Sequence, residues 1–330
     1  MKKADLDNDP NIVDFERGLS QDQKRLMTPS VRMTSSHINA ACSTFWKEAL
    51  GHEPPTMDIK DIDVWEHEDY PGLRILPGVL PLEAQILFIS QVLHRDLANP
   101  LHKINLTADH DLTYPPPSPH SSLFSYLPTD TPSTPKSPSQ PPLPMSTFLS
   151  RKLRWLTLGT QYDWPTRSYP RHSPTPFPSD LSALITALFP AVTPQSGVCL
   201  LYGSKDFMPV HRDVSEQCQT PLASFSFGCD GIFLLARGEE EAHGEEEKRN
   251  RVLPIRVRSG DCVYLSGEAR WAWHAMPRTV AGTAPKGLAE WPAVEGEEER
   301  YKRWKNFMGG KRLNVSCRQV WEGSGEEVMD

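Results

Sequence analysis

The residues best suited to chemistry lie in one short stretch, where His211 and Asp213 are two positions apart. In an extended segment, side chains at i and i+2 point to the same side, so this imidazole and this carboxylate can converge. With a second histidine from elsewhere they would form the facial triad that holds non-haem Fe(II) and leaves coordination positions open. The tripeptide alone is weakly specific, because the same letters recur as His94-Arg95-Asp96, at the end of a predicted helix, where we expect a surface pair.

The candidate for the second histidine is His274, which lies 63 residues beyond His211 and follows a strand and a turn. That interval holds three or four short strand signals, enough to bring the chain back across a β-sandwich. A lone histidine among aromatic residues is more often packed in a core. Its place in one series with the tripeptide and the last strand favours a ligand instead, whereas His243 lies within a glutamate run and is a poor alternative.

The last strand signal, residues 312–320, alternates strictly between polar and apolar side chains. Arg312, Asn314, Ser316 and Arg318 share one face, and Leu313, Val315 and Cys317 share the other. An outer, solvated strand would show the same pattern. If the polar face points into a barrel, two guanidinium groups are desolvated and need anionic partners, and a dicarboxylate ligand would satisfy them.

The elements that must position these residues form a β-rich domain over residues 149–326. Short strand signals separated by Gly-rich turns predict a sandwich or jelly roll, and therefore an α+β chain with a double-stranded β-helix core. Residues 36–110 carry two helical signals and a short strand, and we expect them to pack on that core as an N-terminal extension. The polar residues 1–35 are expected to be largely disordered.

Residues 111–148 form a Pro-rich insertion, with eleven prolines between positions 115 and 144. Such a stretch buries too little apolar surface to order itself, which favours a variable loop. It could also bind an SH3-like partner.

Composition narrows the class of protein. No run of about 18 apolar residues predicts a membrane span, and six scattered cysteines indicate reduced thiols of a cytoplasmic or nuclear protein, with mitochondria left open. The formal charge of −7 becomes +3 once ten glutamates in two runs, 239–247 and 295–299, are set aside. The remaining body is mildly basic, which permits an anionic substrate.

The order His-x-Asp, distant His, and Arg-x-Asn-x-Ser-x-Arg resembles the AlkB family of Fe(II)- and 2-oxoglutarate-dependent dioxygenases, and within it the eukaryotic subgroup of AlkB homologue one. The resemblance extends over about residues 150–326 and more weakly over 64–98. It implies that His211, Asp213 and His274 bind iron. It also implies that 2-oxoglutarate is bound by five residues: Tyr202, Arg312 at the distal carboxylate, Asn314, Ser316 in place of the commoner Thr, and Arg318 toward the metal. One departure is Leu200, where the family has Asn; losing that hydrogen bond would cost about 1 kcal/mol.

The resemblance further implies that O2 and 2-oxoglutarate are consumed, succinate and CO2 are formed, and a methyl group is hydroxylated and released as formaldehyde. A methylated base would have to leave its stack and lie between flat side chains. Five aromatic residues are candidates to hold it: Tyr162, Trp164, Tyr169, Trp271 and Trp273, with Arg270 among their basic neighbours.

We therefore expect a monomeric dioxygenase that demethylates nucleic acid, tRNA or DNA, with methyladenine the favoured base and a role such as DNA repair. Two alternatives remain. The same chemistry could act on a methylated protein such as a histone, or the chain could be a non-catalytic nucleic-acid-binding scaffold that keeps the metal site.

Overall fold

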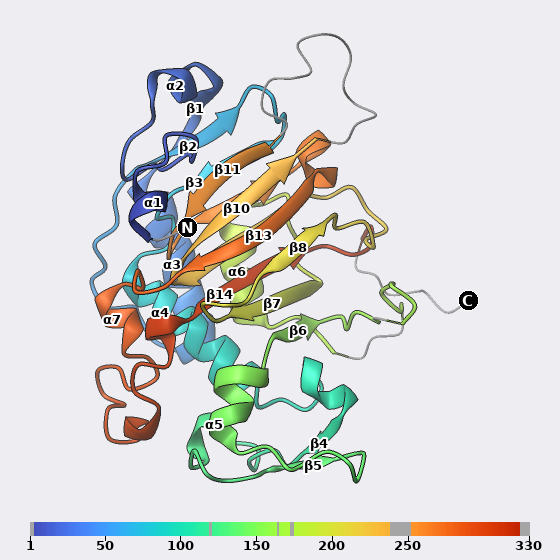
Figure 1. The fold of residues 1–330 in the computed structure, drawn as a ribbon. Helices are drawn as coiled ribbons and strands as arrows, with labels where there is room; N and C mark the ends of the chain where they lie inside the picture. Colours follow the sequence, from blue (N-terminus) through green and yellow to red (C-terminus); the bar gives the residue numbers. More distant parts are fainter. Residues whose placement is uncertain (1–2, 119–120, 164, 172–174, 238–251, 324–330) are drawn as a thin grey trace.

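Two antiparallel sheets face each other in the computed structural model, which describes residues 3–118, 121–163, 165–171, 175–237 and 252–323 (Figure 1). The larger sheet has the order β1 (Met27–Met33), β2 (Ile62–His67), β3 (Leu73–Leu76), β12 (Cys262–Leu265), β9 (Leu222–Gly228), β14 (Arg312–Arg318), β7 (Ser196–Tyr202) and β6 (Trp155–Gly159). The smaller sheet has the order β11 (Val252–Val257), β10 (Asp230–Ala236), β13 (Trp273–Val280) and β8 (Met208–His211). The fold is the expected β-rich α+β jelly roll, because strands distant in sequence pair within both sheets.

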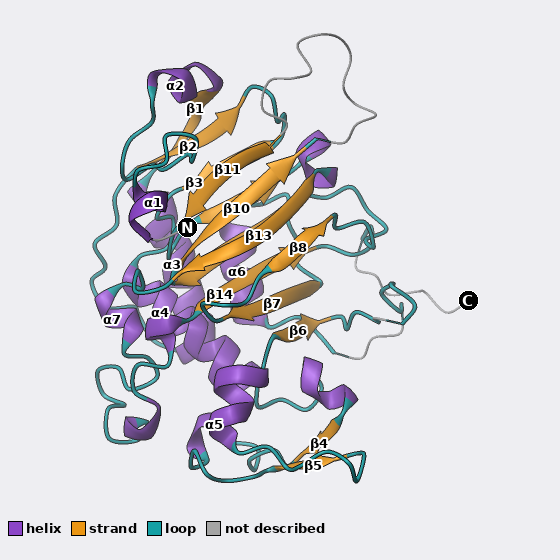
Figure 2. Cartoon of the chain, viewed as in Figure 1, coloured by secondary structure: helices purple, strands orange, loops and turns teal. Residues whose placement is uncertain are grey.

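Three helices cover the larger sheet on the side away from the smaller one: α3 (Ser35–Leu50), α4 (Leu82–Ser90) and α6 (Ser179–Leu188) (Figure 2). The predicted helix near residue 38 begins after Thr34, whose hydroxyl accepts a hydrogen bond from the His37 amide, and ends at Gly51 with φ 74°. Phe88 of α4 packs against the sheet, with ring centroids 5.8 Å from Phe225 and 4.7 Å from Phe227. This contact lies in the largest hydrophobic core.

Strand β14 lies in the middle of the larger sheet, between β9 and β7, and pairs with both over its full length. Its odd residues Leu313, Val315 and Cys317 are buried in the core beneath the helices. Because neighbouring side chains of a strand alternate between faces, the even residues point into the space between the two sheets. The polar face of this strand is therefore an inner face, which excludes the solvated alternative.

The N-terminal residues are folded, contrary to the expectation of disorder over 1–35. They form α1 (Lys3–Asp7), α2 (Gln21–Leu26) and β1, and the side chains of Leu6, Ile12 and Val13 are buried. Val13 also bridges to Ile255 of β11. A few apolar residues suffice here because the acidic residues around them find fixed cationic partners.

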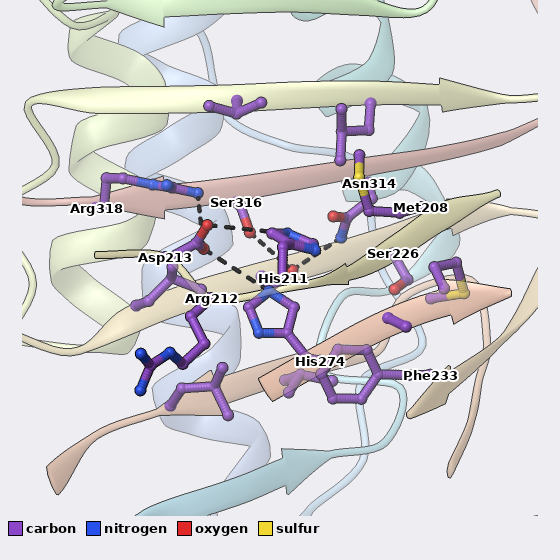
Figure 3. Close-up of a pocket in the computed structure, with 18 of the residues that line it drawn as sticks. Met208, His211, Arg212, Asp213, Ser226, Phe233, His274, Asn314, Ser316 and Arg318 are labelled. Atoms are coloured by element: carbon purple, nitrogen blue, oxygen red, sulfur yellow. Dashed lines mark hydrogen bonds and ion pairs between the residues drawn. The ribbon is translucent and has the colours of Figure 1, made fainter. Parts of the chain in front are cut away.

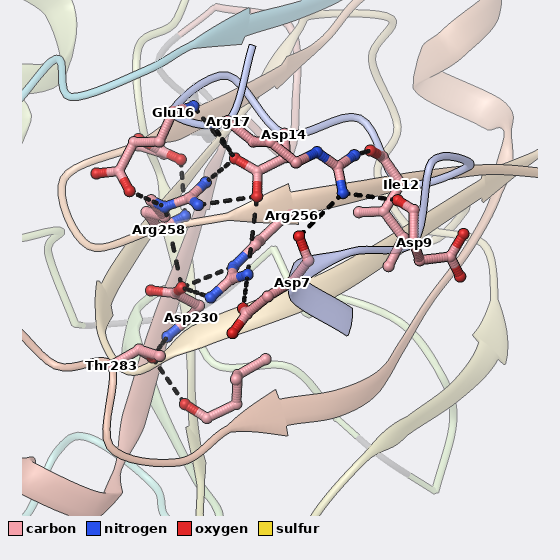
Figure 4. A network of polar contacts seen from close by, with 12 residues as sticks. Asp7, Asp9, Ile12, Asp14, Glu16, Arg17, Asp230, Arg256, Arg258 and Thr283 are labelled. Carbon is pink, nitrogen blue, oxygen red and sulfur yellow. Dashed lines mark hydrogen bonds and ion pairs between the residues drawn. The ribbon is translucent and has the colours of Figure 1, made fainter. Parts of the chain in front are cut away.

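Those partners are two arginines of the smaller sheet region, Arg256 and Arg258 (Figure 4). Arg258 grips Asp14 with nitrogen–oxygen distances of 2.8 and 2.9 Å, and Arg256 binds Asp230 at 2.8 and 2.9 Å and also contacts Asp7. Acidic residues of this polar segment thus anchor it to the rest of the fold. In this network, burial opposes the charge of Asp14, but Arg258 and Arg17 bind it, and its pKa is lowered.

The Pro-rich insertion is also ordered over 111–118 and 121–148, which corrects the sequence-based expectation. It contains β5 (Ser133–Pro135), which pairs with β4 (His110–Leu112), and the short helical turns η3 (Leu123–Ser125), α5 (Met145–Thr147) and η4 (Phe148–Lys152). The side chains of Phe124, Met145 and Phe148 are buried in the main core. These widely spaced apolar residues fasten the proline segments between them, and an SH3-like partner stays a prediction.

The expected surface pair His94 and Asp96 is wrong, because both residues lie inside the protein. They belong to a π-helical turn, η1 (Gln91–Asp96), in which His94 stacks on Tyr301 at 4.6 Å and Asp96 is bound by Arg95. Burial lowers the pKa of His94 to about 3, so this histidine is neutral and structural. Among the described residues, no helix has the length and apolar character needed to span a bilayer.

Candidate metal and cosubstrate site

His211, Asp213 and His274 come together at one end of the space between the sheets (Figure 3). The strands explain how: β13 pairs with β8 so that His274 lies opposite His211, and Asp213 follows His211 by two residues. The Nε2 atom of His211 lies 4.0 Å from Oδ1 of Asp213, and the Nε2 atom of His274 lies 4.0 Å from Oδ2 of the same carboxylate. One ligand atom from each residue lies within 4.8 Å of the others, close enough for one ion to bind all three.

The two histidines are held in the form that binds a metal. The Nδ1 atom of His211 lies 2.8 Å from the Pro209 carbonyl, and Nδ1 of His274 lies 3.1 Å from the Ala272 carbonyl. A carbonyl can only accept a hydrogen bond, so each Nδ1 carries the proton and each Nε2 presents its lone pair to the cluster. Burial lowers the pKa of His274, which keeps that ring neutral and available as a ligand.

Asp213 is the anionic member of the cluster. Burial alone would raise its pKa, but the positive charge of Arg318, with a smaller contribution from Arg270, outweighs that effect, and its pKa is lowered. The closest cation is Arg318, whose Nη2 atom lies 3.4 Å from Oδ2. Two imidazoles and one carboxylate are a donor set that fits Fe(II) with coordination positions left open.

Arg312 marks the other end of the same cavity. Its side chain is 2% exposed, donates to the Ser226 hydroxyl at 2.8 Å and lies over the Tyr202 ring, while its Nε has no hydrogen-bond partner. Within the described part of the chain it forms no ion pair with a carboxylate, and burial lowers its pKa. A buried guanidinium without a counter-ion is costly, so this position fits an anionic ligand.

The cavity between these two ends has a volume of about 340 Å³. Tyr202, Asn314, Ser316 and Arg318, the other residues predicted to bind the cosubstrate, line it, and so does Leu200. Asn314 donates to the Ser224 hydroxyl and the Phe225 carbonyl, at 2.8 and 2.9 Å, and so has its amide nitrogen fixed with its oxygen left to the cavity. Leu200 lies opposite Asn314 in the sheet, so the departure from the family pattern places an apolar side chain in the cosubstrate region.

The five aromatic candidates separate into groups. Tyr162 and Tyr169 line the cavity and contact each other edge to face, with ring centroids 5.1 Å apart. Trp271 and Trp273 do not line it. Trp273 directly precedes the inward-pointing His274 in β13 and faces the other way, with Arg212 4.7 Å from its ring, whereas Trp271 lies before the strand, with Arg270 4.9 Å from its ring. Trp164 lies outside the described residues.

The sequence reasoning missed four residues. Met208 and Phe233 line the cavity beside the histidines. The alternation of β10 could have placed Phe233 there, whereas Met208 is three residues from His211 and lies where the pairing of β8 with β13 shifts register. Glu216 and Arg270 are both buried and paired at 2.8 Å behind Asp213, which also shows that Arg270 is not a free basic neighbour of the substrate. The positions of Glu216 and Arg270 in the sequence give no signal that predicts this ion pair.

Comparison with known proteins agrees with this geometry. The family model of the 2OG-Fe(II) oxygenase superfamily matches residues 118–318. The chain is 38% identical over 279 residues to the N6-methyladenosine RNA demethylase ALKB1 of Pyricularia oryzae, covering 79% of this chain and 78% of that protein. It is 40% identical over 235 residues to the N6-methyladenosine RNA demethylase ALKBH of Cryphonectria parasitica, covering 69% of this chain and 98% of that protein.

A third relative is the tRNA demethylase abh1 of Schizosaccharomyces pombe, which is 30% identical over 267 residues, covering 78% of this chain and 82% of that protein. The matched region contains the three clustered ligand residues, the cavity and the buried arginine. The chain therefore belongs to the 2OG-Fe(II) oxygenase superfamily and, within it, to the AlkB family.

Proposed function

We propose that this protein is an Fe(II)- and 2-oxoglutarate-dependent dioxygenase that oxidatively demethylates nucleic acid, with a methylated adenine in tRNA or DNA as the substrate. The reaction would consume O2 and 2-oxoglutarate and release succinate, CO2 and formaldehyde. One observation carries the proposal: a three-ligand cluster and a buried arginine without a counter-ion lie in one cavity.

The residues at the two ends have separate tasks. His211, Asp213 and His274 would hold Fe(II), which when bound supplies the redox chemistry that activates O2. Arg312 would pair with one carboxylate of 2-oxoglutarate, and Tyr202 would add a neutral hydroxyl, since burial raises its pKa to about 12. Asn314 is held by the Ser224 hydroxyl and the Phe225 carbonyl, so its carbonyl oxygen is already oriented before a ligand binds.

The remaining cavity residues shape the reaction space. Met208, Phe233 and Leu200 present apolar surface beside the histidines, which excludes water from the reacting methyl group. Tyr162 and Tyr169 lie where a flipped base could enter, and a stacked base gains about 1–3 kcal/mol from such a contact. The Tyr162 hydroxyl lies 3.3 Å from the Ser215 hydroxyl, so a polar pair is available to an edge of that base.

Support for a nucleic-acid substrate comes from the relatives, which are named demethylases of RNA and of tRNA. It also comes from the tyrosines, because flat side chains accept any base.

The test is turnover of methylated oligonucleotides with Fe(II), ascorbate and 2-oxoglutarate, read as succinate, formaldehyde and loss of the methylated nucleoside by mass spectrometry. RNA and DNA strands carrying N6-methyladenine or 1-methyladenine, and a methylated histone peptide, should be compared side by side. Asp213→Ala is expected to abolish every readout, while Asp58→Ala, which changes an exposed carboxylate 3.9 Å from the Lys60 ammonium, serves as the matched control.

Succinate formation that depends on a methylated oligonucleotide and is lost in Asp213→Ala is the expected result. Equal turnover by Asp213→Ala and the parent chain would overturn the metal assignment. Turnover of the peptide alone would move the substrate class to protein.

A further inference from the structure

We propose that Glu216 and Arg270 are positioning residues that, together with Arg318, fix the orientation of the Asp213 carboxylate for metal binding. The inference rests on the metal role proposed for Asp213 and extends it to residues outside the ligand set. Four charged residues, Asp213, Glu216, Arg270 and Arg318, form a closed ring of contacts at the metal cluster.

Each contact in the ring is short. Arg318 lies between two carboxylates, 3.4 Å from Asp213 Oδ2 and 2.8 Å from Glu216 Oε1. Arg270 lies on the other side of Glu216, 2.8 Å from Oε2, and donates a further hydrogen bond at 2.9 Å to the backbone carbonyl of Asp213. The chain of contacts therefore leaves Asp213 through its carboxylate and returns to it through its carbonyl.

The ring fastens three segments that are distant in sequence. Asp213 and Glu216 follow β8, Arg270 belongs to the turn η7 (Gly267–Trp271) just before His274, and Arg318 ends β14. The side chains of Glu216 and Arg270 are each 1% exposed, so water does not compete for these contacts. The ring thus holds the loop that carries Asp213 against the turn that precedes His274.

The ring is also electrically balanced. Two carboxylates and two guanidinium groups give the ring zero formal charge. Without Glu216, the single carboxylate of Asp213 would lie beside two arginines whose charges it could not balance. Arg318 and Arg312 therefore have different surroundings: Arg318 already contacts two protein carboxylates, whereas Arg312 contacts none among the described residues. Without Glu216, the excess positive charge would repel a divalent cation and draw Asp213 toward Arg318.

The experiment measures binding of Mn(II), used as a redox-stable stand-in for Fe(II), and then of 2-oxoglutarate at saturating Mn(II), both by calorimetry on the full chain. Glu216→Gln is expected to weaken Mn(II) binding by about 10-fold or more. The same variant should bind 2-oxoglutarate at least as tightly as the parent, because the cavity has lost a negative charge. A general loosening of the fold would weaken both ligands.

A charge-balanced double variant sharpens the test. Glu216→Gln combined with Arg270→Met restores zero formal charge among the remaining members, and it should bind Mn(II) more tightly than Glu216→Gln alone. Because removing both members avoids a buried unpaired charge, this variant also keeps the proposal testable if the single variant fails to fold. Arg270→Met alone removes a positive charge instead of a negative one, so 2-oxoglutarate binding should weaken by about threefold or more.

The N-terminal network offers a matched control, because Asp230 is also a buried carboxylate bound by an arginine (Figure 4). Asp230→Asn should lower the melting temperature and leave Mn(II) affinity unchanged. If the parent protein binds no Mn(II), the proposed function fails. If the parent binds Mn(II) and Glu216→Gln binds it within about twofold, or if both ligands weaken alike, the ring has no positioning role.

Discussion

Replacing Arg312 with methionine should weaken 2-oxoglutarate binding while making the ligand-free protein more stable. The guanidinium is 2% exposed, has one hydrogen bond to the Ser226 hydroxyl and has an Nε without a partner. In the complex it would gain two charge-assisted hydrogen bonds with a carboxylate, worth about 1.5–3 kcal/mol each. A loss of about 3–5 kcal/mol lowers the affinity at least about a hundredfold.

The stability effect has the opposite sign. Methionine removes a buried charge that has no counter-ion and keeps most of the apolar stem, so the ligand-free variant should gain about 1–3 kcal/mol. For a chain of this size that corresponds to a rise of a few degrees in melting temperature, at about 2–4 °C per kcal/mol. Saturating 2-oxoglutarate at about 100 times its Kd should stabilise the parent by about 2.7 kcal/mol and the variant very little.

Calorimetric titration of 2-oxoglutarate into the Mn(II)-loaded protein measures the first effect, and thermal melts with and without 2-oxoglutarate measure the second. Arg312→Lys is the control, because it keeps the charge and loses the forked geometry, and its affinity should be intermediate. An Arg312→Met variant that binds 2-oxoglutarate within about threefold of the parent would refute the reasoning.

Three further predictions follow from other sites. Burial lowers the pKa of His94 to about 3 and that of His102 to about 4, so both stay neutral in the fold while the unfolded chain takes up protons below about pH 6.5. Stability should therefore fall as pH drops from 6.5 toward 4, by up to about 1.4 kcal/mol per pH unit for each histidine, and urea unfolding of His94→Phe should show a shallower loss. A Cβ added at Gly231 would lie 2.7 Å from Arg312 Nε and 2.6 Å from Met276 Sδ, so Gly231→Ala should displace the arginine. The variant should show a raised Kd for 2-oxoglutarate with only a small change in melting temperature. An unchanged Kd would mean that the arginine side chain adjusts freely. Arg256→Met removes the close cationic partner of the buried Asp230 and should cost about 3–5 kcal/mol in urea unfolding, with 2-oxoglutarate affinity unaffected.

The core of the site could be predicted from the sequence because strand geometry constrains it. The i, i+2 spacing of His211 and Asp213 and the strict alternation from Arg312 to Arg318 each have a direct meaning in an extended chain. The assignment of His274 depended on the order of these signals along the chain. Strand pairing places it opposite His211.

The residues that could not be predicted depend on contacts between distant segments. Glu216 and Arg270 carry no periodic signal, and only the folded chain brings them together. Trp273 lies one residue from His274, yet one residue in a strand reverses the direction of the side chain. The polar N-terminal segment resembled a disordered one, because composition does not reveal that Asp14 forms an ion pair with the distant Arg258.

The central position of β14 has a consequence for how the protein is made. This strand is the last one among the described residues, yet it must enter between β9 and β7, which begin about 90 and 116 residues earlier in the sequence. While the ribosome is still translating, the two inner edges of the larger sheet stay unpaired and exposed to wrong partners. The chain can therefore acquire Arg312, Arg318 and a closed core only in one late step, and a nascent chain that stops before residue 312 would be both unable to bind 2-oxoglutarate and prone to aggregate.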